Sequence, residues 1–463
     1  MKRVKRIALA LAALLATTAP AAAQTVAITG GRVVVGDGSA PIDGGTVIVR
    51  DGRVVAAGAN VAVPAGATVV DATGKWVTPG LVAGFSRIGL VEVDAVGNTN
   101  DVSANNSPFS AAIDVAPAVN PSVASIAINR AAGITRAVVA PGTARSVFAG
   151  QGAVIDLGDD MQPITRARAF QFVELGEEGS NDAGGSRASA HALLRNALRE
   201  AGQLRLPIQG AGSGGMRPAD MNPQLEDQPD FRMFEPQRER PADVLLTRFD
   251  AAALVPVVRG QQPLLIHVNG ANDILQVLRL RREFPNLKLV LVGAAEGWRV
   301  AREIAAARVP VIANALTNLP ASFEQVAATQ SNIGRMREAG VQVGIGMINE
   351  DEARMIQVSP QYAGNLVALT RVPGHTGVEW NEAFALISAR PAEVMGLGGE
   401  IGSLRPGRRG DVVIWSGDPL ELASAVEAVW IDGVPQNLTT HQTRLRERYR
   451  TLERGPLPTG YTR

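Results

Sequence analysis

The middle of the chain alternates short apolar runs with longer stretches of helical spacing, and this alternation constrains the fold more than any other feature. Runs such as 263–268 and 309–313 are rich in Val, Leu and Ile, as strands buried on both faces are. Strands that alternate with helices form parallel sheets, so the sequence predicts an α/β domain with an open sheet or a closed barrel. The expected elements are a helix at 124–132, strands at 135–140 and 263–268, a helix at 271–283, a strand at 287–292, a helix at 297–307, a strand at 309–313, a helix at 330–339 and a strand at 341–347.

The two ends of the chain have a different pattern, which is typical of antiparallel strands. Near the start, three β-branched runs between residues 33 and 55 are separated by Gly and Asp turn residues. Near the end, the runs at 411–415 and 428–431 precede the tight-turn pair Asp432-Gly433. Because both β-rich ends flank one α/β region, we expect the ends to pair with each other.

The first 23 residues have the features of a signal peptide. Basic residues lie between 2 and 6, an apolar run follows at 7–16, and Ala21-Ala22-Ala23 supplies the small residues of a cleavage site. We expect cleavage near Ala23 and a periplasmic or secreted protein. The apolar run is too short to cross a bilayer, so no stable membrane span is expected. Removal of four basic residues would change the formal net charge from +1 to −3, and nothing indicates nucleic-acid binding.

Two further segments differ from the rest of the chain. The stretch at about 204–241 is rich in Gly, Pro and charged residues, which predicts a lid-like insertion rather than a core element. The tail at 441–463 carries charges at helical spacing, which predicts a solvated helix.

Histidine, lysine and cysteine are scarce in this chain, which limits the sites it can build. There is no Cys and there are four His. A disulfide scaffold and a thiolate metal site are therefore excluded. A histidine-rich centre would need nearly all of the histidines, which are His191, His267, His375 and His441.

Four segments carry a resemblance to a known family. They are Val70–Val82, Ala132–Thr135 with its continuation to Val154, Ile266–Ile274, and Ile401–Trp415. Together they resemble the metal-dependent amidohydrolase superfamily, specifically its imidazolonepropionase-like branch. The resemblance implies a (β/α)8 TIM-type barrel at 80–397, and a small composite β-sandwich formed by the N- and C-terminal segments 24–79 and 398–440. It also implies hydrolysis of amide-like or cyclic C–N bonds with one or two divalent metals.

The resemblance implies metal ligands that this chain lacks at several positions. The family's first barrel strand carries His-x-His, and here those two slots hold Phe85 and Arg87. Phe has no metal-binding atom, and Arg brings a permanent positive charge. The bridging lysine of strand four is missing, since no lysine lies between Lys75 and Lys288. No metal cofactor is therefore expected from these slots.

The later strands contain one matching ligand. His267 matches the histidine of strand five, whereas the run at 290–296, which matches strand six, has no histidine. Ile348 occupies the slot of the last-strand aspartate, and Asn349 follows it before two acidic residues. Zinc or another divalent metal would be expected only if a shift in alignment brought one of these acids into the slot.

Five residues are candidates for the site at the carboxyl ends of the barrel strands. His267 is the candidate catalytic residue, and Arg87, Asn269, Glu296 and Asn349 are candidate substrate-binding residues. Arg87 either binds an anion where the family has metal, or forms an internal ion pair. Strand alternation directs Ser86 away from the side of Arg87, which disfavours a Ser–His arrangement.

These observations leave two functional hypotheses. The first is an exported hydrolase of carbon–nitrogen bonds that are amide-like but not ordinary peptide bonds, with a small amide or an anionic molecule as ligand. The second is a catalytically silent barrel, a pseudoenzyme with a degenerate metal site. Such a chain would act as a binding or scaffold subunit, alone, as a homo-oligomer, or paired with an active amidohydrolase relative.

Overall fold

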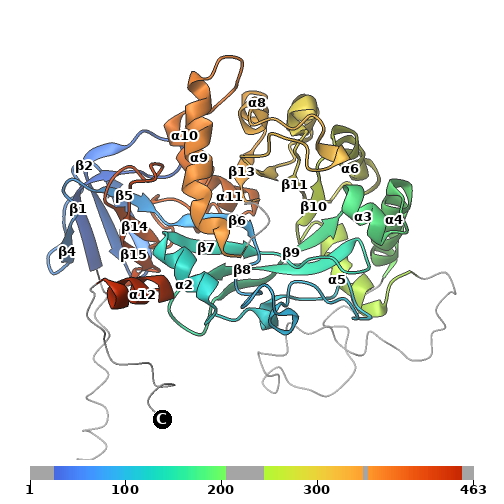
Figure 1. Ribbon diagram of the computed structural model, residues 1–463, viewed down its shortest axis with the longest axis horizontal. Helices are drawn as coiled ribbons and strands as arrows, with labels where there is room; N and C mark the ends of the chain where they lie inside the picture. The colour runs from blue at the N-terminus through green and yellow to red at the C-terminus, as the bar shows by residue number, and fades with distance from the viewer. Residues whose placement is uncertain (1–24, 205–244, 348–352, 451–463) are drawn as a thin grey trace, which may run out of the picture.

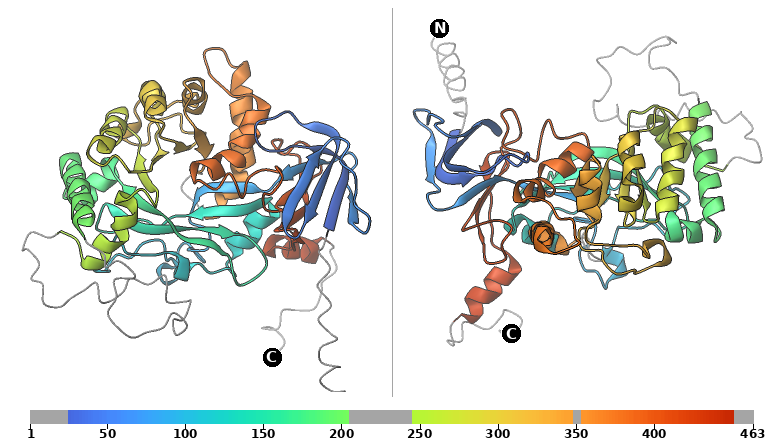
Figure 2. Two further views of the ribbon diagram at one scale, coloured as in Figure 1. Left: turned by 180° about the vertical axis from the view of Figure 1, so that it is seen from behind. Right: turned by 90° about the horizontal axis from the view of Figure 1, so that it is seen from above.

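The structure is a computed structural model that describes residues 25–204, 245–347 and 353–450. The proposed signal peptide, nearly all of the insertion at 204–241, Asn349 and the end of the tail lie outside these residues. Two eight-stranded sheets organise the described chain, and they lie side by side in all views (Figures 1 and 2). None of the described helices is long and apolar enough to cross a membrane.

One sheet forms a nearly closed barrel. Its strand order is β13-β12-β11-β10-β9-β8-β7-β6, and the two end strands contact each other. The strands are almost wholly buried, because helices cover the outside and side chains fill the inside. They are β6 (Leu81–Ser86), β7 (Ile134–Val139), β8 (Phe148–Asp156), β9 (Ile164–Glu174), β10 (Leu264–Val268), β11 (Leu289–Gly293), β12 (Val311–Ala313) and β13 (Val343–Ile345).

The expected strict (β/α)8 pattern is wrong at one strand. β8 runs antiparallel to both β7 and β9, whereas the other neighbouring strands pair in parallel. The connections at 140–147 and 157–163 contain no helix. They are too short for the crossover that a parallel pair requires, so the chain turns back in hairpins.

Helices follow the other strands and pack on the outside of the barrel. α6 shows the cause: Ile274, Val277 and Leu280 recur at helical spacing and are fully buried. The α-helices of this layer are α2 (Ala124–Ala131), α3 (Gly176–Asp182), α4 (Arg187–Gln203), α5 (Arg248–Val258), α6 (Ala271–Glu283), α7 (Ala301–Ala307), α8 (Asn332–Glu338), α9 (Ser359–Ala368), α10 (Trp380–Ala385) and α11 (Ala389–Val394). Short 3-10 turns are η1 (Gly97–Thr99), η2 (Ala116–Ala118), η6 (Gly297–Val300), η7 (Phe323–Gln325), η8 (Met355–Val358) and η9 (Leu369–Arg371).

Backbone contacts complete the barrel between its first and last strands. Ile345 N–H donates to the carbonyl of Leu386 (2.8 Å), and Val82 N–H donates to that of Ile387 (3.0 Å). The segment before α11 therefore bridges β13 and β6. A Cβ atom on Gly84 would lie 2.7 Å from the carbonyl oxygen of Ile345, so this close approach requires glycine.

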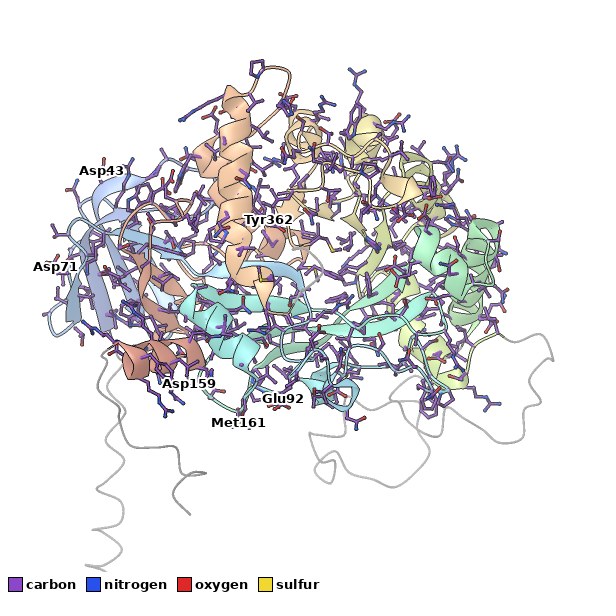
Figure 3. All side chains as sticks on the ribbon, viewed as in Figure 1. Asp43, Asp71, Glu92, Asp159, Met161 and Tyr362 are labelled. Carbon is purple, nitrogen blue, oxygen red and sulfur yellow. The ribbon has the colours of Figure 1, made fainter. Side chains whose placement is uncertain are left out.

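The second sheet joins the two ends of the chain. Strands β14 and β5 pair antiparallel, from Val412 opposite Pro79 to Trp415 opposite Trp76. Figure 3 labels Asp43 and Asp71 at the outer side of this sheet. The strands form one hydrogen-bonded sheet, and a two-layer sandwich stays a prediction. They are β1 (Thr25–Val33), β2 (Ile42–Arg50), β3 (Arg53–Gly58), β4 (Thr68–Asp71), β5 (Trp76–Pro79), β14 (Val412–Trp415), β15 (Val426–Ile431) and β16 (Val434–Pro435), followed by the exposed helix α12 (His441–Tyr449).

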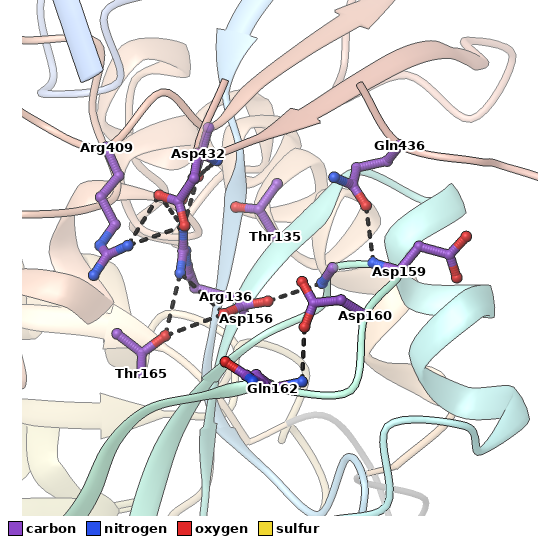
Figure 4. Close-up of polar contacts among 12 residues, drawn as sticks. Thr135, Arg136, Asp156, Asp159, Asp160, Gln162, Thr165, Arg409, Asp432 and Gln436 are labelled. Atoms are coloured by element: carbon purple, nitrogen blue, oxygen red, sulfur yellow. Dashed lines mark hydrogen bonds and ion pairs between the residues drawn. The ribbon is translucent and has the colours of Figure 1, made fainter. Parts of the chain in front are cut away.

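A buried arginine links the barrel to the terminal sheet (Figure 4). The Arg136 side chain, on β7, is 0% exposed. Its Nε and Nη2 atoms donate to the two carboxylate oxygens of Asp411 (2.7 and 2.9 Å). Its Nη2 atom also lies 2.8 Å from Asp432, and its Nη1 atom lies 3.5 Å from Asp156. Charges from both sheets therefore meet around one guanidinium group.

Candidate functional site at the barrel mouth

The interior of the barrel is apolar up to the carboxyl ends of the strands. Phe85, Phe170, Phe172, Leu265 and Val292 belong to one buried cluster inside it. Alternate residues of a strand share a face, so the next inward positions along β9 and β10 are Glu174 and His267. The apolar interior thus forms the floor beneath a polar mouth.

Glu174 and His267 form a bonded pair at this mouth. His267 Nδ1 lies 2.5 Å from a carboxylate oxygen of Glu174. The His267 side chain is 17% exposed and the Glu174 side chain is 8% exposed, so water reaches the imidazole more than the carboxylate. Burial raises the pKa of the Glu174 carboxyl, and the charge and hydrogen bond of His267 act against that rise. The pair is held in register because His267 lies directly opposite Glu174 in the parallel pairing of β10 with β9.

Asn269 lies on the other side of the imidazole. Its Nδ2 atom is 3.4 Å from His267 Nε2, and it also donates to Glu324 Oε1 at 3.0 Å. Since Asn Nδ2 is a donor, this contact assigns Nε2 as the acceptor and Nδ1 as the protonated nitrogen. The sequence-predicted residues His267 and Asn269 are therefore brought together, and Nε2 is the basic nitrogen of the ring.

Glu324 fixes Asn269 from the loop after β12. Its carboxylate is 8% exposed and accepts the backbone N–H of Glu177 at 2.9 Å. Gly176 makes room for it, because a Cβ atom there would lie 2.3 Å from Glu324 Oε2, and its φ of +76° also favours glycine.

Arg87 places a permanent positive charge at the same mouth. Its Nη1 atom donates to the carbonyls of Ala140 (2.5 Å) and Pro141. Its guanidinium lies over the rings of Phe85 and Phe172, at 5.0 and 5.7 Å from their centroids. The positive charge of Arg87 acts to lower the pKa of the Glu174 carboxyl and so opposes the rise that burial causes.

Glu296 is engaged in holding loops together. Its carboxylate accepts the backbone N–H groups of Ala271 (3.2 Å) and Ala327 (2.9 Å), and it pairs with Arg299 at 3.1 Å. These contacts tie the loops after β10, β11 and β12 to each other. Asn349 lies outside the described residues. Ser86 donates its hydroxyl to the carbonyl of Val138 (2.9 Å), on the side away from the mouth.

The sequence reasoning missed Glu174 and Glu324. An acid directly after the buried run at 170–173 was the available signal for Glu174, because such a residue sits at the carboxyl end of its strand. Glu324 lies in the short 3-10 turn η7, within the connection after β12, and gave no local signal.

The described mouth contains few metal donors. Within the described residues, no three or more His, Asp or Glu side chains are arranged to hold a metal ion. Glu174 and His267 are the two candidate donors described above, and they are bonded to each other.

Known proteins resemble the chain in both sequence and structure. The model of the Amidohydrolase family matches residues 299–435, from the second half of the barrel into the terminal sheet. The amidohydrolase tasK of Hapsidospora irregularis is 25% identical over 392 residues, which cover 80% of this chain and 37% of the relative. The chain thus spans a little over a third of the length of that curated relative.

A solved structure shares the fold. An amidohydrolase from Thermotoga maritima MSB8 superposes with a TM-score of 0.72 at 24% identity, over 89% of this chain and 99% of that one. The chain therefore matches the Amidohydrolase family in sequence over residues 299–435 and shares the fold of the Thermotoga maritima amidohydrolase over most of its length.

Proposed function

We propose that this chain is an exported hydrolase of amide-like carbon–nitrogen bonds that uses the Glu174–His267 pair in place of a metal centre. The observation that carries the proposal is the 2.5 Å contact between the carboxylate and His267 Nδ1 at the barrel mouth. Active sites of such barrels lie at this end of the strands. The sequence match to the Amidohydrolase family at 299–435 supports the reaction class, and the segment at 1–23 supports export.

The described donor set does not fit a metal centre. A catalytic zinc site takes three protein ligands, whereas the mouth offers Glu174 and His267. The first-strand slots hold Phe85, which is buried in the barrel interior, and Arg87, whose charge repels a cation. We therefore propose that the metal site of the family is degenerate in this chain, and that the mechanism uses only protein side chains.

The pair can act as a general base and then as a general acid. His267 Nε2 takes a proton from a water molecule, and the hydroxide forms a bond to the amide carbonyl carbon. Glu174 orients the ring and stabilises the imidazolium that results. Arg87 supplies positive charge for the tetrahedral oxyanion. The C–N bond then breaks as His267 returns the proton to the leaving nitrogen, which yields an acid and an amine.

A catalytically silent barrel is the second candidate. The observation in its favour is Arg87, whose guanidinium donates to two backbone carbonyls and lies over two aromatic rings. Such a site would bind the carboxylate of a small molecule without turning it over, and the barrel would act as a subunit beside an active relative.

Turnover of N-acyl amino acids and cyclic amides tests the proposal. The purified mature protein is assayed before and after chelation, beside His267→Ala, Glu174→Gln and the control His375→Ala, an exposed loop histidine. We expect chelation to have no effect and both site variants to lose about 100-fold or more in kcat, with the control unchanged.

Two results would contradict the proposal. Stoichiometric zinc, with turnover lost on chelation, would show that a metal does the chemistry. Binding of these amides without turnover by the unmodified chain would favour the silent barrel, and co-purification would then identify its partner.

A further inference from the structure

We propose that the amino ends of the barrel strands form a second binding site, for a small organic molecule with negative charges at two ends. A cavity of about 490 Å³ opens there, within the range of small-molecule sites. Five basic residues and one acid supply the charged part of its lining, a net charge of +4. They are Arg166, Arg168, Arg281, Lys288, Arg308 and Glu393.

The sheet geometry brings these cations close together. β9, β10, β11 and β12 are consecutive neighbours. Lys288 and Arg308 precede β11 and β12, and Arg166 and Arg168 lie in the first half of β9. Neighbouring strands are about 5 Å apart, so these strand starts span an arc of about 15 Å. That span suits one molecule with two charged ends better than a single ion.

The cavity is separate from the mouth. Pro263 lines it just before β10, whereas His267 stands at the other end of that strand. Four residues of a strand span about 13 Å, and Leu265 and the rest of the apolar interior lie between.

Two of the cations have no partner among the described residues. Lys288 and Arg308 are exposed, and neither forms an ion pair or a side-chain hydrogen bond within the described chain. Arg166 pairs with Glu400 and Arg168 with Asp114, at 3.2 and 3.5 Å, but neither acid lines the cavity. A ligand would therefore meet two positive charges, those of Lys288 and Arg308, that no acid of the described chain pairs with.

The attraction of cations to the carboxyl ends of helices explains only some of the basic residues that line the cavity. Arg281 lies in the last turn of α6 and Arg308 follows α7, where cations favour the helix dipole. Lys288 and Arg168 belong to no helix. Moreover, Arg308 and Arg168 take left-handed backbone conformations, with φ of 50° and 47°. Glycine is the ordinary residue at a helix end of this geometry, so arginine at position 308 costs free energy that binding of a charged ligand can offset.

Calorimetric titration with fructose 1,6-bisphosphate tests the site on the full mature chain. Lys288→Glu/Arg308→Glu reverses the two unpartnered charges on the surface. Arg302→Glu/Arg444→Glu is the matched control, because both residues are exposed and form no ion pair among the described residues. We expect saturable binding that is at least about tenfold weaker in the first variant and within twofold of the unmodified chain in the control. The affinity should also fall as salt rises.

Titrations with inorganic phosphate and with phosphatidylglycerol vesicles test whether the site prefers a small molecule with two charged ends to a single phosphate or a lipid surface. Phosphate should bind at least about tenfold more weakly than the bisphosphate, since it cannot span both ends of the site. Equal weakening in both double variants, no saturable binding of the bisphosphate, or binding to phosphatidylglycerol vesicles alone would each overturn it. If the first variant does not fold, Lys288→Gln provides the same comparison with a smaller perturbation.

Discussion

Replacing Arg136 by Met should destabilise the protein strongly, because the change leaves buried carboxylates without their counter-ion. Asp411 is 4% exposed and receives two hydrogen bonds from Arg136, and Asp432 lies 2.8 Å from it. Removing one member of a buried ion pair typically costs about 3–5 kcal/mol. If the described chain unfolds as one unit, its unfolding entropy is roughly 0.8 kcal/mol/K. The melting temperature should then fall by about 4–6 °C.

The pH dependence makes this prediction more specific. Burial alone would raise the pKa of Asp432, but attraction to Arg136, with hydrogen bonds from Arg136 and Arg409, holds it below its usual value. In the unmodified protein, the ionised Asp432 carboxylate therefore stabilises the fold at pH values above its pKa in the unfolded chain. This stabilisation is lost only as the pH falls through its lower pKa in the folded protein. Without Arg136, burial would raise the folded pKa of Asp432. The variant should then gain stability relative to the unmodified protein as pH falls from 7 to 5.

Differential scanning calorimetry at pH 7 and pH 5 provides the measurement. Arg409→Met is the matched control, because Arg409 also binds Asp432, at 2.9 Å, but is 30% exposed. Its loss should cost about 1 kcal/mol or less. The reasoning is refuted if both variants lose the same stability at pH 7, or if the deficit of Arg136→Met does not change with pH.

Three further outcomes are expected. Gly176→Ala should destabilise the protein by about 1–3 kcal/mol in denaturant titrations and lower turnover, because its Cβ atom would meet Glu324 Oε2 at 2.3 Å; unchanged values would contradict the close approach. Ser86→Ala should cost about 1 kcal/mol of stability without loss of turnover, because its hydroxyl bonds Val138; lost turnover would give the hydroxyl a catalytic role. Chelation should leave the melting temperature unchanged, since a metal held by the fold would stabilise it, and a decrease would reveal such an ion.

Local sequence patterns predicted individual elements well. The helix expected at 271–283 is α6 with the same bounds, because its apolar residues recur at helical spacing and a Gly precedes it. The helix expected at 297–307 begins instead with the 3-10 turn η6, and α7 starts at Ala301. β8 was not anticipated as an antiparallel strand, because strand direction depends on connection length rather than on the apolar pattern of the strand.

The amino-acid sequence was enough to predict the alternation of strands and helices and the β-rich character of both ends, and its family resemblance assigned Phe85 and Arg87 to the first-strand slots. Tertiary structure alone decided what stands beside His267. Glu174 lies 93 residues earlier in the chain, and Glu324 lies in the short 3-10 turn η7 after β12. Periodicity and turn chemistry are local properties that a sequence displays directly. The pairing of β9 with β10, which joins carboxylate to imidazole, is a long-range choice that depends on the register of the whole barrel.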